Sequence, residues 1–205
     1  MNPTSLSTRG LVAGALIALA GCGALPDKPV RPAVFDFGPG SSQVAAPADP
    51  AAAPLVLAEI EAPPARDGTA MLYRLAYADA REARPYAQSR WAMPPPQLLR
   101  QRLVARLAAQ RPVVAVDEAP RAPVLRVELE EFSQLFEAPD RSAGLVRLRA
   151  TVVDASAPAA QRVRQRLFVA QRPAPSADAA GGVRALSDAA DAAVDELARW
   201  LAAGR

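Results

Sequence analysis

The residues of this chain that could do chemistry are few, and one of them is a single cysteine, Cys22. The 205 residues contain no histidine, so neither a Ser-His-Asp nor a Cys-His catalytic arrangement can form, and a metal site rich in histidine or cysteine is excluded. A lone thiol has no partner for a disulfide within the chain. We therefore predict no catalytic residue, no metal and no dissociable cofactor.

The other cluster of residues that could do chemistry consists of three carboxylates, Glu128, Glu130 and Glu131. A two-carboxylate hydrolase needs its acid groups on opposite sides of a cleft. Here the three residues follow one another along a single predicted strand, so we interpret them as strand surface. The chain is predicted not to be an enzyme, and an acid–base hydrolase is the alternative.

The segment before Cys22 explains why the cysteine is there. A polar start with one cation leads into the apolar run 11–20. Such a run spans about 15 Å as a helix, half of the ~30 Å core of a bilayer, and is typical of a secretory signal. Leu19, Ala20 and Gly21 before Cys22 resemble a bacterial lipobox, which implies that residues 1–21 are removed and that acyl chains are joined to Cys22. An ordinary signal peptide with a chance cysteine is the alternative.

Residues 22–54 are predicted to be the lipidated cysteine and a proline-rich tether. Seven prolines lie between residues 23 and 54, and no helical or alternating pattern survives among them. Gly23 and Ala24 follow the cysteine, and the absence of aspartate there favours the periplasmic face of the outer membrane of a diderm bacterium. Within the tether, Val34–Gly38 carries two aromatics at alternate positions and could instead form an edge strand or dock on the domain.

Residues 55–205 are predicted to form one domain of the α/β class, leaning to α+β. We expect a mixed, largely antiparallel sheet of about six strands with two amphipathic helices packed on it. One helix follows Pro94–Pro96, with leucines at 98, 99, 103 and 107 as its apolar stripe. The other covers about 183–203, and its inner stripe is formed by Leu186, Ala190, Val194, Leu197 and Leu201. The expected strands are 55–60, 71–77, 113–116, 125–136, 145–154 and 162–170.

The last three strands are predicted to form an antiparallel meander with one polar face. In 125–136 the apolar positions change phase, which indicates a bulge near Glu131. In 162–170 the apolar positions Val163, Leu167 and Val169 oppose the arginines. Charged residues on the polar face are interpreted as a solvated, charge-balanced surface, with an anionic headgroup or an acidic partner as the alternative. These residues are Glu128, Glu130, Arg147, Arg149, Arg164 and Arg166.

The stretches 71–74 (MLYR) and 86–95 (YAQSRWAMPP), followed by a leucine- and arginine-rich helix from Gln97, resemble the ABC-type transport auxiliary lipoproteins. These are the PqiC-like partners of MCE-type lipid transport systems. The resemblance implies a non-enzymatic component that docks with an MCE-domain protein and an inner-membrane ABC permease and ATPase, and that supports lipid movement and envelope integrity. An outer-membrane lipoprotein that activates a cell-wall synthase or assists lipopolysaccharide assembly is the alternative function.

Three residues of these stretches are candidates for partner binding: Arg74, Arg90 and Trp91. Tryptophan is enriched at interface hot spots, although a core position is the alternative for Trp91. A homo-oligomer is compatible with a docking module, and the lipid anchor supplies the contact with the membrane. We expect no nucleic acid, because no aromatic residues interleave with the arginines.

Substituting Cys22→Ala tests the anchor. Without the thiol there is no thioether to carry acyl chains, so the chain should leave the membrane fraction for the soluble periplasmic fraction when cells are fractionated. A variant that stays as membrane-bound as the unmodified chain would show that the anchor assignment is wrong.

Overall fold

The structure is a computed structural model that describes residues 31–39, 52–115 and 117–204. The predicted signal peptide 1–21, its residues Leu19, Ala20 and Gly21, and Cys22 lie outside these described residues. The compact unit begins at Pro32. It therefore includes a short part of the segment that the sequence analysis assigned to the tether.

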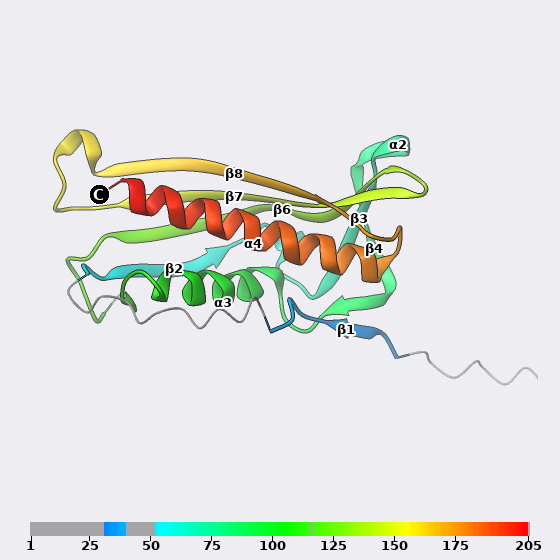
Figure 1. The fold of residues 1–205 in the computed structure, drawn as a ribbon, viewed down its shortest axis with the longest axis horizontal. Coiled ribbons are helices and arrows are strands. Elements are labelled where there is room, and N and C mark those ends of the chain that lie inside the picture. Colours follow the sequence, from blue (N-terminus) through cyan, green and yellow to red (C-terminus); the bar gives the residue numbers. More distant parts are fainter. Residues whose placement is uncertain (1–30, 40–51, 116, 205) are drawn as a thin grey trace, which may run out of the picture. The chain divides into compact units, whose positions relative to one another are not determined.

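One long strand, β6 (Val124–Ala138), organises the sheet (Figure 1). Along one edge it pairs antiparallel with β7 (Arg141–Val153), which in turn pairs antiparallel with β8 (Val163–Pro173). Its other edge is shared by two parallel strands: β2 (Leu55–Glu61) lies beside its first half and β3 (Ala70–Leu75) beside its second half. The predicted meander of the last three strands is thus confirmed.

Three further strands complete the sheet. β4 (Ala80–Trp91) pairs antiparallel with β3, β1 (Ala33–Phe35) pairs parallel with β4, and β5 (Val113–Val114) pairs parallel with β2. The mixed, mostly antiparallel architecture is as predicted, with eight strands among the described residues in place of about six. β1 falls at the start of the stretch Val34–Gly38, for which an edge strand was one of two possibilities, and the strand that the sequence did not reveal is β4. Most side chains of β4 are exposed on both faces, so it carries no alternating pattern.

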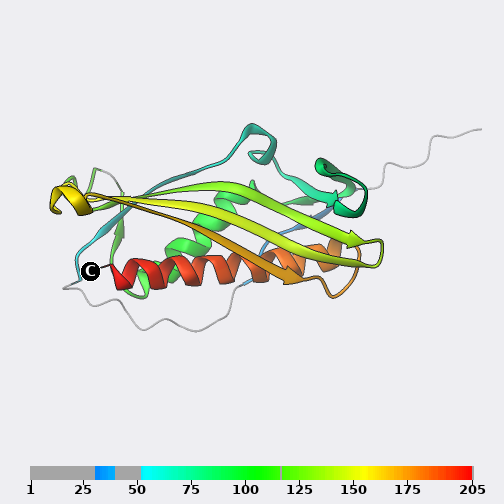
Figure 2. The same cartoon turned by 90° about the horizontal axis from the view of Figure 1, so that it is seen from above.

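Two helices cover one face of the sheet and leave the other open (Figure 2). α3 (Pro95–Ala108) packs on β2, and its predicted leucine stripe is buried. α4 (Ala179–Ala203) packs on β7 and β8, and its predicted inner stripe is buried as well. α4 begins before the predicted start at about Val183, because Asp178 caps it by accepting a hydrogen bond from the Gly181 N–H at 2.7 Å. A third, short helix, α2 (Ala76–Asp79), ends β3 earlier than predicted.

The bulge predicted near Glu131 is present in β6. The register with β7 shifts between Leu129 and Glu131. Before the shift, Leu125, Val127 and Leu129 are buried, and after it the large buried side chains are Phe132 and Phe136. The bulge adds one residue to β6, so the alternation of side chains shifts by one position there. The shift keeps the apolar side chains on the helix-covered face on both sides of the bulge.

The segment at Val34–Gly38 docks on the domain. Phe37 is buried, and its ring lies 5.7 Å from that of Trp91 and 5.8 Å from that of Phe132. Arg102 of α3 donates a hydrogen bond to the Phe37 carbonyl. Gly38 follows with φ +68°, a left-handed conformation that suits glycine. Of the two possibilities that the sequence left open, the structure combines the short strand with docking.

Gly144 of β7 lies close against the backbone of α4. A Cβ built at this position would lie 2.5 Å from the backbone of Ala185 and Leu186 in α4. Backbone atoms cannot move aside as a flexible side chain can, so a side chain here must push α4 away from the sheet.

We expect Gly144→Ala to destabilise the domain by about 1–3 kcal/mol, the usual range for overpacking a core. Urea unfolding followed by circular dichroism measures this. Gly68→Ala is the matched control, since a Cβ at Gly68 meets nothing within 4 Å. Equal free energies of unfolding for the two variants would contradict the close approach.

Candidate functional site

Trp91 is a core residue, which is the alternative that the sequence left open beside partner contact. It is 1% exposed, and its ring packs against Phe37 and, at 5.5 Å, against Phe132. Trp91 ends β4 where β1 pairs with that strand, so the residues of the segment before the domain cover it. The sequence alone did not reveal this cover, because the covering strand is only three residues long.

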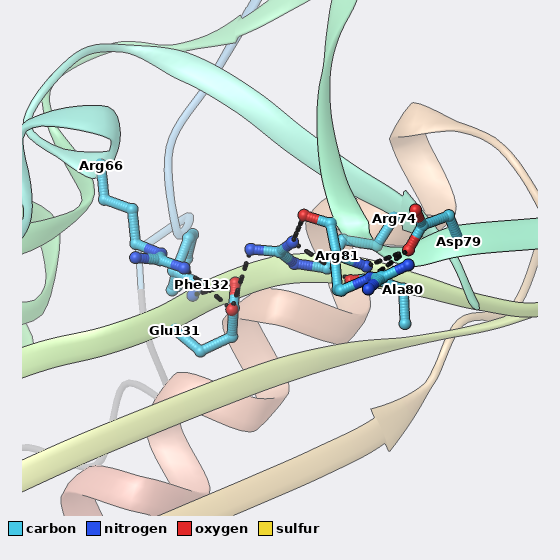
Figure 3. A network of polar contacts seen from close by, with 7 residues as sticks. All are labelled: Arg66, Arg74, Asp79, Ala80, Arg81, Glu131 and Phe132. Carbon is cyan, nitrogen blue, oxygen red and sulfur yellow. Dashed lines mark hydrogen bonds and ion pairs between the residues drawn. The ribbon is translucent and has the colours of Figure 1, made fainter.

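Arg74 is also engaged inside the protein, as Figure 3 shows. Its guanidinium donates hydrogen bonds to the carbonyls of Ala80 and Arg81 at 3.2 and 3.0 Å, and to Oε2 of Glu131 at 3.2 Å. These bonds hold the turn between β3 and β4 against β6. Arg74 therefore has a structural role within the domain, and its contact with a partner stays a prediction.

Glu131 is held by a second arginine, Arg66, whose guanidinium lies 2.9 Å from the same carboxylate oxygen (Figure 3). Arg66 ends a 3-10 turn, Pro64–Arg66, and the sequence carried no signal for its role. The three side chains are only 13–15% exposed, and the Nε atoms of both arginines are buried without a hydrogen-bond partner among the described residues. The triad joins three segments of the chain and carries one net positive charge.

A second buried polar network lies at the start of α4. The Tyr86 hydroxyl donates to Oε1 of Gln134 at 2.8 Å, and the Gln134 amide donates to Ser142 Oγ at 2.8 Å. Burial, with smaller contributions from Tyr73 and Asp178, raises the pKa of Tyr86 to about 12. The hydroxyl therefore stays protonated at neutral pH and serves as a structural donor.

Arg90 is the one predicted partner-binding residue that the structure leaves accessible. It is exposed on β4, and no ion pair of its guanidinium occurs within residues 31–39, 52–115 and 117–204. Its backbone lies between Val34 of β1 and Ala70 of β3.

The predicted polar face exists on β6 and β7, and we call it the open face, since neither helix covers it. Arg149 lies across from Glu128 in the register and donates to Glu130 at 2.6 Å. Glu128 and Glu130 thus share one cation on a strand surface, as predicted. Arg147 is exposed beside them.

The predicted phase of β8 is wrong. Arg164 and Arg166 lie on the helix side, where Arg166 pairs with Glu196 at 2.6 Å and Arg164 stacks 5.3 Å from the ring of Trp200. The buried apolar residues of that side are Phe168 and Ala170. The long stems of arginine can cross apolar surface while the charge reaches a carboxylate or water.

The inverted phase places aliphatic side chains of β8 on the open face. Val163 is 61% exposed, Leu167 44% and Val169 49%. The sequence favoured the opposite orientation because three aliphatic residues outnumber one phenylalanine. The decisive partners, Glu196 and Trp200, come from a helix far along the chain.

Hollows open to solvent lie beside α4 in the described part of the chain. One of about 430 Å³ lies between the end of β8 and the carboxylates of α4, and another of about 460 Å³ lies between β1 and α4. Within the described part of the chain, no group of three or more metal-ligating side chains is placed to hold an ion. No helix among these residues is long and apolar enough to cross a membrane.

These features define a two-layer α/β domain with one helix-covered and one open sheet face. Residues 35–198 match the family described as the ABC-type transport auxiliary lipoprotein component, and the chain belongs to this family. The resemblance seen in the sequence is thereby confirmed. Membership makes the chain an auxiliary lipoprotein of the cell envelope that associates with ABC-type transport components.

Solved structures share this fold. Protein XCC0632 from Xanthomonas campestris is 21% identical, with a TM-score of 0.63 over 85% of this chain and 94% of that one. An uncharacterised protein is 14% identical, with a TM-score of 0.64 over 83% of this chain and 99% of that one. At these identities the likeness concerns the fold. Among curated proteins, no sequence match to this chain is found.

Replacing Glu131 with glutamine should destabilise the domain by about 1–3 kcal/mol in urea unfolding, because two poorly exposed arginines lose their shared carboxylate. This is less than for a fully buried pair, since the side chains keep some contact with water. Glu59→Gln is the control: its carboxylate is 84% exposed beside Arg100, and we expect a change below about 0.5 kcal/mol. Equal effects would contradict a structural role for the triad.

Proposed function

We propose that this protein is the lipid-anchored docking component of an MCE-type lipid transport system. It is held at the periplasmic face of the outer membrane by acyl chains on Cys22. It contacts an MCE-domain protein and, through it, an inner-membrane ABC permease and ATPase. In this position it supports lipid movement and envelope integrity.

The observation that carries the proposal is the family match over residues 35–198, which covers the domain from β1 to α4. The 205 residues contain no GxxxxGK[ST] phosphate loop. The energy for transport must therefore come from a partner, which agrees with an auxiliary role.

A role without catalysis is part of the proposal, and the placement of the carboxylates supports it. Glu131 is bound by Arg66 and Arg74, while Glu128 and Glu130 lie along a flat strand beside Arg149. None of these pairs faces a second carboxylate across a cleft, as a two-carboxylate hydrolase requires. The same arrangement suits a domain that presents a surface to another protein.

In-cell crosslinking of the full, tagged chain, followed by mass spectrometry, tests the proposal. We expect an MCE-domain protein and an ABC permease among the crosslinked partners. The Cys22→Ala variant is the control, because a chain released from the membrane should lose most of these crosslinks. Recovery of peptidoglycan synthases with no MCE-domain protein would favour the alternative function and overturn this one.

A further inference from the structure

The backbone of β8 has one edge that pairs with β7 and one that faces outward. The N–H of Ala174 donates to the Ser142 carbonyl, and the N–H of Asp154 donates to the Arg162 carbonyl, both at 2.8 Å. In an antiparallel pair such bonds recur at every second residue. Because the register of β7 and β8 is continuous, the backbone N–H and C=O groups of even-numbered β8 residues bond to β7. Those of odd-numbered β8 residues point away from β7. The outward-facing residues are Val163, Gln165, Leu167, Val169 and Gln171.

This outward edge is long and regular. β8 has eleven residues, no shift in its register with β7, and a proline only at its last position. Proteins commonly protect edge strands by making them short, or with bulges and internal prolines. At the other ends of the sheet, β1 and β5 have three and two residues. They pair with only part of β4 and β2, whose remaining edge residues have no strand partner on that side among the described residues. Among the described residues, no strand other than β7 pairs with β8.

The two faces of β8 have different chemistry. Three of the residues whose backbone faces outward, Val163, Leu167 and Val169, place exposed aliphatic side chains on the open face. The helix-side face carries arginines. Residues 162–173 contain no carboxylate, and only one of the arginines has an ion pair among the described residues, Arg166 with Glu196. The arginines of β8 are Arg162, Arg164, Arg166 and Arg172.

This charge pattern argues against a second copy of the chain as the occupant of the edge. Two antiparallel copies of β8 would bring arginines of the same face next to one another, and like charges on neighbouring strands are destabilising. A strand with carboxylates on the arginine side and aliphatic residues on the other side is complementary to the side chains of β8 itself. Near Arg172, such a strand would also lie close to the α4 carboxylates Asp188, Asp191, Asp195 and Glu196. Cross-strand pairs of these kinds each stabilise a sheet by about 0.2–1 kcal/mol.

We propose that the outer edge of β8 is a strand-addition site for an extended segment of a partner protein in which aliphatic and acidic residues alternate. The partner's backbone would bond to the odd-numbered residues of β8 and extend the sheet. The inference depends on the proposed docking function in one respect only: it requires that the chain has a partner protein. It concerns neither the lipid anchor nor the identity of the transport system.

A synthetic peptide of alternating valine and glutamate, as long as β8, is the probe, and the full chain is used in detergent. Amide hydrogen exchange followed by NMR should show fast exchange at residues 163, 165, 167, 169 and 171 in the free chain. Saturating peptide should slow these amides by about tenfold or more. A peptide with lysine in place of glutamate is the control and should leave them unchanged. No protection by the valine–glutamate peptide, or equal protection by both peptides, would overturn the proposal.

Two variants of β8 sharpen the test. Leu167→Pro removes an outward N–H that β7 does not use, so peptide affinity should fall by about tenfold or more. Leu167→Thr keeps the N–H and a strand-forming side chain, and its affinity should stay within about threefold. Arg172→Glu, on the exposed end of the arginine side, should weaken binding several-fold by reversing the charge, although it also removes the hydrogen bond at 3.0 Å from the Arg172 guanidinium to the Gln171 carbonyl. Retained affinity in both Leu167→Pro and Arg172→Glu would contradict strand addition.

Sedimentation of the full chain separates this proposal from self-pairing and from failure of the proposed function. Self-association that Leu167→Pro abolishes would assign the edge to a second copy and overturn the acidic occupant. Peptide binding as predicted, without an MCE-domain protein among the crosslinked partners, would support the edge site while the transport role failed. The two failures are therefore distinguishable.

Discussion

The extra residue in β6 is the constraint on which the rest of the domain depends. β6 must present apolar side chains to the helices along its whole length. At the same time, the edge opposite β7 pairs first with β2 and then with β3. The register shift between Leu129 and Glu131 lets Phe132 return to the helix-covered side. It also turns the Glu131 carboxylate to a place where two arginines from other segments reach it.

The arginines of this chain therefore serve several physical roles. Arg66 and Arg74 are structural, because their shared carboxylate ties a 3-10 turn and the β3–β4 connection to the central strand. Arg102 joins α3 to the short segment that covers Trp91. The arginines of β8 lie at an open edge, where Arg166 pairs with Glu196 and Arg172 lines a hollow beside the carboxylates of α4. A basic composition alone does not distinguish these roles, since each depends on which carboxylate or ring the tertiary structure brings near.

The functional interpretation depends on which parts of the sheet a partner can reach. One face of the sheet is occupied by α3 and α4, so it is unavailable to a partner. The open face and the edge of β8 remain, with exposed aliphatic residues that no helix covers. For an auxiliary lipoprotein, a free strand edge offers backbone bonding that depends little on the partner's exact sequence. The side-chain pattern of β8 supplies selectivity in addition.

Local pattern in the sequence determined the meander, the bulge near Glu131, the leucine stripe of α3 and the inner stripe of α4, because each is a periodicity visible within a few turns or a few strand residues. The family was also recognisable from residues 71–97. Tertiary structure alone decided that Trp91 is buried, that Arg74 is held inside, and which face of β8 meets α4. In an alternating strand, the local pattern does not decide which of the two faces is buried, and residues elsewhere in the chain determine it. Here these residues are Glu196 and Trp200 for β8. For Trp91 the covering residue is Phe37.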